Sequence, residues 1–290
     1  MLADAIRAEG YRLSKNRTAL FWSVVFVPVV AVAIGALTNL VLKGSETKLL
    51  GDAKAPPELR EMLVSSPLDL AGAMVSAAAD LANPLILAFI LIGAATLYAG
   101  DYRWESWRLI SARNSRTNLL LGKLVVVAGL SLIAMVLMLV AGLIETLIRA
   151  AVFDRPLTFS MTGAMLGQFL GQFALSWLRI VQFTMVGMLA AVVTRSLLAA
   201  LFVPLVVGVA QFFSPNMLVP MGLAPDSWPA VLVNPGSAVD AISALIAGGA
   251  EATALPDGLP LKASISLALW ILVPLGASIT WFRRQDLSKE

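Results

Sequence analysis

LVVVAGLSLIAMVLMLVAGLI, residues 124–144, is an unbroken apolar stretch without Asp, Glu, Lys, Arg or Pro. A helix needs about 20 such residues to cross the hydrocarbon core of a bilayer, which is about 30 Å thick. The stretch is therefore long enough for one membrane-spanning helix. Whether the chain crosses the membrane once or several times depends on how often such runs recur.

Uncharged runs of comparable length recur along the 290 residues, at 18–42, 81–100, 156–178, 196–225 and 263–282. Arg179 ends the run 156–178, but uncharged residues resume at Ile180 and continue to Thr194. Prolines from Pro204 to Pro225 interrupt the fifth, so we end that helix near Phe213. The runs predict an all-α membrane protein, a single transmembrane domain, with spans at 18–42, 80–100, 118–148, 165–194, 197–213 and 263–282.

Composition excludes several classes of protein. Hydrophobic residues make up 59% and charged residues 13% of the chain, against about 25% charged in an average soluble domain. The runs are apolar throughout rather than alternating, which argues against an outer-membrane barrel. The chain has no His and no Cys, so imidazole and thiolate chemistry is absent. We therefore expect no catalytic residues and no metal site. We also expect no nucleic-acid binding, because the Lys and Arg residues sit at helix ends.

The distribution of positive charge predicts the orientation. With the N-terminus on the inside, 13 of the 21 Lys and Arg residues fall in inner segments and seven in outer segments. Lys and Arg near span ends are retained on the cytoplasmic side. We therefore expect a multi-pass protein of the inner (cytoplasmic) membrane with both termini in the cytoplasm. The charged start of the chain does not resemble a removable signal peptide.

Two further segments flank the predicted spans. Residues 1–17 have apolar and polar side chains on opposite sides of a helical wheel, which predicts an amphipathic helix in contact with membrane lipid; a basic leader that only sets the topology is the alternative. Residues 214–262 are apolar but rich in Pro and Gly, which predicts short re-entrant helices, with 236–247 as one of them. An extracellular loop with a short surface helix is the alternative.

The segment 101–116, between the second and third spans, interleaves aromatic and charged residues. It contains no Gly or Pro, and Trp104 and Trp107 share one side of a helix, so a short amphipathic helix at the membrane face is expected. Two indoles and neighbouring charges suit docking to a soluble partner. The alternative is a loop whose Trp residues only anchor it at the interface. The candidate docking residues are Asp101, Trp104, Glu105, Trp107, Arg108, Arg113 and Arg116.

A second group of candidate residues lies on the predicted fourth span. Gln168, Gln172, Arg179 and Gln182 are spaced by four, seven and three, so they form one polar stripe. Burying Arg179 in lipid would cost roughly 2.5–3.5 kcal/mol, so the stripe faces protein or water. It is either a wall of a substrate pathway or polar glue between helices, with Arg179 paired to a carboxylate such as Glu145 or Asp80. Glu145 is also four residues from Arg149, which favours a local ion pair.

The order of these elements resembles the ABC-2 type permeases, the membrane subunits of ATP-binding-cassette exporters. The resemblance rests on Lys15-Asn-Arg17-Thr, Asp101, Trp107-Arg108-Leu109, Ser115-Arg116, Gly122-Lys123 and the tail from Phe282 to Leu287. It implies that 101–116 is a coupling helix that fits a cleft in a soluble ATPase subunit. It also implies a second copy of this chain, or a related permease, as a partner. Glu105-Ser106 and Asn114 depart from the family pattern within this helix.

The chain has no phosphate-binding loop of its own. Gly122-Lys123 is followed by Leu124, and no Gly lies five positions before Gly122, so the pattern that cradles ATP phosphates is missing. An exporter subunit of this kind would therefore depend on its partner to bind ATP and Mg²⁺. A membrane enzyme acting on lipids and a secondary transporter are the alternative functions.

Overall fold

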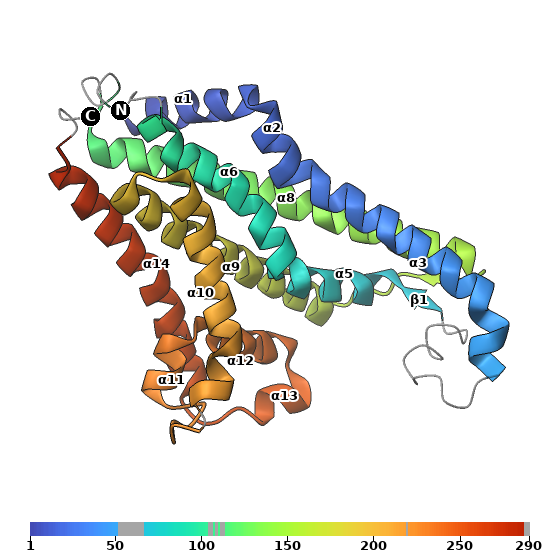
Figure 1. The fold of residues 1–290 in the computed structure, drawn as a ribbon. Helices are drawn as coiled ribbons and strands as arrows, with labels where there is room; N and C mark the ends of the chain where they lie inside the picture. The colour runs from blue at the N-terminus through green and yellow to red at the C-terminus, as the bar shows by residue number, and fades with distance from the viewer. Residues whose placement is uncertain (52–66, 104–106, 108–109, 111–113, 219, 287–290) are drawn as a thin grey trace.

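The computed structural model describes residues 1–51, 67–103, 107, 110, 114–218 and 220–286. These residues form an almost entirely helical protein (Figure 1), and six helices are long and apolar enough to cross a membrane. The candidate spans are Arg17–Ser45, Pro84–Tyr102, Arg116–Val152, Gly163–Thr194, Leu197–Leu218 and Leu259–Arg284. The prediction of an all-α protein with six helices suited to span a membrane is confirmed.

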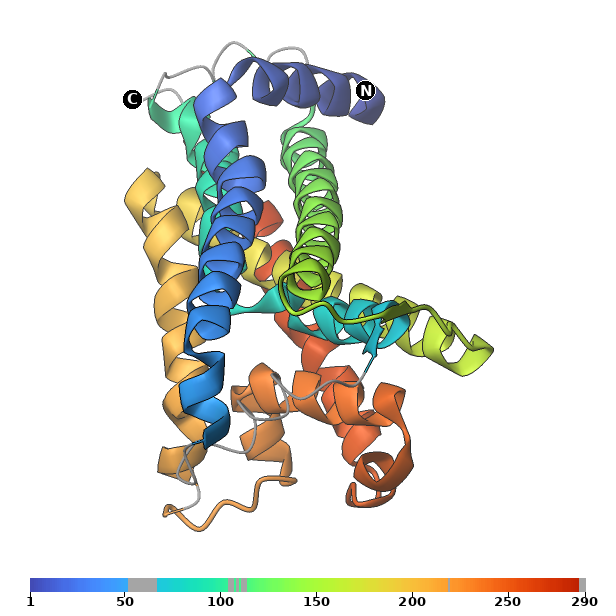
Figure 2. The same cartoon turned by 90° about the vertical axis from the view of Figure 1, so that its right-hand side faces the viewer.

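The chain begins with a helix that lies across one end of the bundle. Helix α1 (Leu2–Lys15) is followed at Asn16 by α2 (Arg17–Leu20), a π-helical turn η1 (Phe21–Val25) and the long α3 (Phe26–Gly51). The Asn16 side chain accepts a hydrogen bond from the Ala19 amide and so begins α2. Figure 2 shows α1 at a steep angle to the helices below it.

The second predicted span is divided in the structure. Helix α5 (Leu70–Ala79) is followed by a 3₁₀ turn (Asp80–Ala82), and α6 begins only at Pro84 and ends at Arg103. The sequence predicts that this span starts at 80. The break arises because a residue before proline is disfavoured in the helical conformation; Asn83 is extended, with ψ 157°, and its side chain caps α6.

Three long helices follow α6 in the chain. They are α8 (Arg116–Val152), α9 (Gly163–Thr194) and α10 (Leu197–Leu218). Two-residue strands β1 (Leu68–Asp69) and β2 (Leu157–Thr158) pair in parallel before α5 and α9. The sequence prediction ended α10 near 213, but the helix retains both Pro204 and Pro215 and ends at Leu218, since neighbouring groups in a membrane protein can satisfy the backbone that proline frees.

Short helices precede the last long one. They are α11 (Trp228–Val233), α12 (Pro235–Ala247) and α13 (Gly249–Thr253), followed by α14 (Leu259–Arg284). Helix α12 covers almost the same residues as the helix expected at 236–247. It packs against α14 and α9 through a small apolar cluster that includes Leu175, Ala238, Ala241 and Leu267. The larger core lies between α6, α8, α9 and α10.

Candidate functional site

The N-terminus and the C-terminal end of α14 lie at the same end of the bundle (Figure 1). The Asn114 side chain donates to the Met1 carbonyl over 2.9 Å. Arg116 donates to the carbonyls of Phe282 and Gln285 over 3.0 and 2.6 Å, and the Gln285 amide donates to the Val192 carbonyl. We call this end, defined by Met1, Asn114, Arg116 and Gln285, the terminal face.

A buried group of charges lies just beneath the terminal face. The Lys123 ammonium group is 2.5 Å from Asp101 Oδ2 and 3.0 Å from Glu9 Oε1, and it donates to the Leu97 carbonyl. The side chains of Lys123 and Asp101 are fully buried, and that of Glu9 is 4% exposed. These contacts join α1, the end of α6 and the first turns of α8.

Arg12 completes this charged group. Its guanidinium lies 2.7 Å from Asp101 Oδ1 and 3.2 Å from Glu9 Oε1. Burial lowers the pKa of Arg12, but the hydrogen bond and charge of Asp101, helped by Glu9, outweigh burial and raise that pKa. Two cations therefore balance two carboxylates in a group of four, Glu9, Arg12, Asp101 and Lys123, which we call the charge cluster.

Trp107 is packed inside the chain. Its ring centroid lies 4.5 Å from that of Phe282 and 5.6 Å from that of Tyr102, and the Lys123 ammonium lies 5.2 Å from the indole. The side chain has no exposed surface. The sequence analysis expects this indole to contact a partner, whereas in the structure it contacts side chains of α6, α14 and α8.

The predicted coupling residues divide into three groups. Asp101 belongs to the charge cluster, and Trp107 and Arg116 are joined to the C-terminal end of α14. Trp104, Glu105, Arg108 and Arg113 lie outside the residues that the structure describes. The sequence analysis does not identify Glu9, Arg12 and Lys123 as members of a charge cluster. The available signal is that all of them lie in segments predicted at one membrane face.

A cavity of about 890 Å³ lies farther along the bundle, between the start of α6, α9, α10 and α12. Its polar lining comes from Asp80, Asn83, Arg179, Gln211, Asn234, Ser237 and Asp240. Its apolar lining includes Leu87, Phe183, Leu205, Val209, Phe212 and Phe213. A pocket of this size, mostly apolar with a few polar groups, has the usual form of a small-molecule site.

Arg179 is held on one wall of this cavity. Its Nη2 donates to Gln211 Oε1 over 2.7 Å, its Nη1 donates to Gln182 Oε1 over 3.2 Å, and its guanidinium lies 4.7 Å from the Phe183 ring centroid. Asp240 is the acid whose charge acts on Arg179. Of the carboxylates considered from the sequence, Asp80 shares the cavity, but Glu145 does not line it.

The other two stripe residues have a different role. Gln172 donates to the Ser243 carbonyl over 3.0 Å and accepts from the Ser243 hydroxyl, and Gln168 donates to the Ala247 carbonyl. Both therefore attach α12 to α9. The predicted stripe is divided into an outer pair that bonds two helices and an inner pair, in which Arg179 lines the cavity and the buried Gln182 accepts a hydrogen bond from it.

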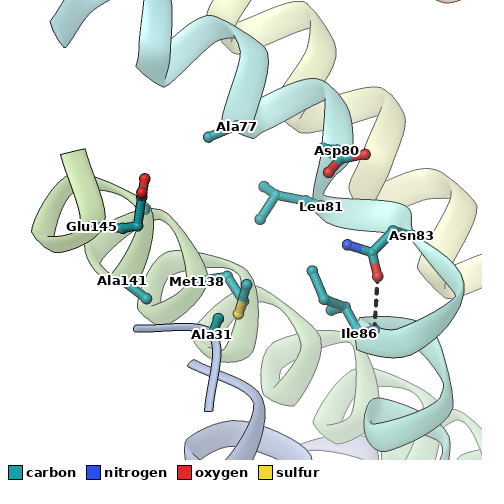
Figure 3. A pocket seen from close by; sticks show the side chains of 10 residues that line it. Ala31, Ala77, Asp80, Leu81, Asn83, Ile86, Met138, Ala141 and Glu145 are labelled. Carbon is teal, nitrogen blue, oxygen red and sulfur yellow. Dashed lines mark hydrogen bonds between the residues drawn. The ribbon is translucent and has the colours of Figure 1, made fainter. Parts of the chain in front are cut away.

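A smaller cavity of about 180 Å³ lies on the other side of the α5–α6 junction. Figure 3 shows the side chains of Asp80 and Glu145 approaching it from different helices. Glu145 Oε1 accepts a hydrogen bond from the Asn39 amide over 3.0 Å, and no pair with Arg149 occurs in the described part of the chain. Asp80 and Asn83 line both cavities.

Comparisons with family models, with curated proteins and with solved structures find no match for this chain. We therefore infer its function from its residues, their contacts and the positions of the two cavities.

Proposed function

We propose that this chain is the membrane-spanning permease subunit of an ATP-binding-cassette exporter. In this proposal a separate soluble subunit binds ATP and Mg²⁺ and hydrolyses ATP. The segment 101–116 acts as the coupling helix, and a substrate leaves the cell through a path that includes the larger cavity. The chain works with a second copy of itself or with a related permease, and its termini lie in the cytoplasm.

The observation that carries the proposal is the attachment of both ends of the 101–116 segment to the helix bundle. At its start, Asp101 contacts Lys123 of α8 and Arg12 of α1. At its end, Arg116 donates to carbonyls at the end of α14. A partner that moved this segment would therefore move α1, α6, α8 and α14 together, because packed and charged contacts transmit displacement.

The larger cavity supports the transport part of the proposal. Charged and amide side chains at membrane depth are costly unless they face protein or a wet cavity, so they usually mark a substrate or ion pathway. Arg179 faces such a cavity, one wall of which is formed by α10 and another by α12. Movement of α6, whose first residues line the cavity, would change the shape of this space.

The decisive experiment replaces two of the predicted docking charges of the coupling segment. Arg108→Ala combined with Arg113→Ala should weaken co-purification with a co-expressed soluble ATPase subunit by about tenfold, as loss of interfacial charge pairs does. ATP hydrolysis stimulated by the permease should fall in proportion, while the amount of inserted protein stays constant.

Arg284→Ala is the matched control, because Arg284 is an exposed arginine on the last turn of α14, outside the segment. It should leave ATPase binding unchanged. If the double variant binds the ATPase as tightly as the parent chain, or if no ATPase co-purifies with the parent chain, the proposed function is wrong.

A further inference from the structure

The larger cavity combines one cation, two anions and an apolar wall, and this combination defines the kind of molecule that it suits. Arg179 supplies the positive charge, and Asp80 and Asp240 supply the negative charges. A ligand with only negative charge would meet both carboxylates, and a ligand with only positive charge would meet Arg179. A ligand that carries both charges can satisfy both sides of the cavity.

The positive side of the cavity lies where α9 meets the start of α12. Arg179 uses one hydrogen bond on Gln211 and one on Gln182, so its remaining N–H groups are available to an anion. A Cβ atom at Gly236 would lie 3.4 Å from Arg179 Nη2, which places the guanidinium at the N-terminal, positive end of α12. Beside it, the buried Nε2 of Gln182 has no hydrogen-bond partner among the described residues.

The negative side lies at the junction of α5 and α6. Asp80 is an exposed residue that lines the cavity, and its carboxylate forms no ion pair with another described residue. Asp240 differs, because its charge interacts with that of Arg179. Asp80 is thus the acid that remains for a ligand amine.

The apolar wall extends from the cavity to the outer surface of α10. Phe212 and Val209 line the cavity and are also 75% and 58% exposed. An apolar tail bound at the cavity can therefore continue along α10 toward lipid, while aromatic rings at Phe183 and Phe213 contact the part near the head.

We infer that this cavity binds a zwitterionic amphiphile, with its anionic group on Arg179 and Gln211 at the start of α12, its amine on Asp80 and its apolar chain along α10. The inference rests on the proposed function only in that such a molecule would be the exported substrate class. Binding itself requires no ATPase, so it is measured on the isolated chain.

The test compares lauroyl lysolipids with the purified chain in a nonionic detergent by isothermal titration calorimetry. Lauroyl lysophosphatidylethanolamine carries both charges, lauroyl lysophosphatidylglycerol carries only the anion, and dodecylamine carries only the cation. We expect the zwitterion to bind about tenfold more tightly than either other probe, because charge-assisted hydrogen bonds form at both ends. Glycerophosphoethanolamine, which has the same head without a chain, should bind at least tenfold more weakly.

Two substitutions separate the two ends of the ligand. Arg179→Gln should remove the preference over dodecylamine, and Asp80→Asn should remove the preference over lysophosphatidylglycerol. Arg179→Lys, which retains the charge, should keep most of the zwitterion preference and shows whether loss in Arg179→Gln reflects charge rather than misfolding. Glu251→Gln, on exposed α13 and outside the cavity, should change none of the affinities.

Equal binding of the three charged probes, or a preference that survives both Arg179→Gln and Asp80→Asn, would overturn the inference. Binding of glycerophosphoethanolamine as tight as that of lauroyl lysophosphatidylethanolamine would also overturn it, because the apolar wall would then contribute nothing to binding. A chain that selects the zwitterion but docks no ATPase would refute only the proposed function. A chain that docks the ATPase but does not select the zwitterion would refute only this inference.

Discussion

The Lys123 ammonium lies 2.5 Å from Asp101 Oδ2, and neither side chain is exposed. The two residues come from different helices, α8 and α6, and Glu9 and Arg12 of α1 complete their surroundings. An ion pair so deeply buried is costly to desolvate, and it becomes far more costly if one partner is removed. The charge cluster therefore holds three helices in one arrangement.

Removing both members of the buried pair should destabilise the protein less than the two single removals added together. Lys123→Met removes one of the two cations that neutralise the buried Asp101 carboxylate. We expect this variant to lose about 3–5 kcal/mol in the free energy of unfolding. Lys123→Met combined with Asp101→Leu should lose less than the sum of the two single variants. Thermal unfolding of the purified variants in detergent measures this coupling, and strictly additive losses would show that the pair does not act as a unit.

The close approach of α1 to α8 should depend on Gly122. A Cβ atom at this position would lie 2.9 Å from the Ala5 Cβ and 3.1 Å from the Ala5 backbone carbonyl carbon, so Gly122→Val should push α1 away. Leu13, which is 7% exposed in the parent chain, would then become accessible, as labelling of a Leu13→Cys substitution would detect.

Gly129→Val is the control for this steric effect. Gly129 lies on the same helix, and a Cβ atom there would meet nothing within 4 Å. Labelling at position 13 should remain slow in this variant. Equally fast labelling in both valine variants would mean that α1 is displaced by a general loss of stability.

The orientation can be tested directly because the chain has no Cys. Single cysteines at two exposed positions, Arg284→Cys at the end of α14 and Glu251→Cys on α13, probe opposite ends of the molecule. In intact cells a membrane-impermeant maleimide should label only position 251, since Lys and Arg near span ends favour the cytoplasm. Labelling of position 284 alone would mean that the topology is inverted.

The attachment of α12 to α9 should depend on Gln172 more than on Gln168. Gln172 exchanges two hydrogen bonds with Ser243 and is 5% exposed, whereas Gln168 makes one bond near the surface. Gln172→Ala should lower the free energy of unfolding by about 1 kcal/mol, within the range for polar contacts between membrane helices.

A double-mutant cycle isolates this contact. Ser243→Ala removes the hydroxyl partner of Gln172 but leaves the Ser243 carbonyl in place. The loss caused by Ser243→Ala should be smaller in the Gln172→Ala background than in the parent chain. Equal losses in both backgrounds would show that the hydroxyl contributes nothing through Gln172.

The helix break before α6 could have been recognised from local sequence. Asn83-Pro84 is a recognisable capping residue followed by proline at the first helical position, and the structure uses it in this way. The predicted start of the span at 80 gives more weight to hydropathy than to the proline. The continuation of α10 through Pro215 is the opposite case, because local chemistry disfavoured a helix that the fold retains.

The six apolar runs could be located from the linear sequence, because the cost of placing charge in hydrocarbon acts on each segment separately. The spacing of Gln168, Gln172, Arg179 and Gln182 likewise showed a shared helix face. The charge cluster and the cavity could not be located in this way. Glu9 meets Lys123, and Arg179 meets Gln211, across gaps in the chain that only helix packing closes. The partner of a buried polar group depends on which helices become neighbours, and similar apolar surfaces allow many such arrangements.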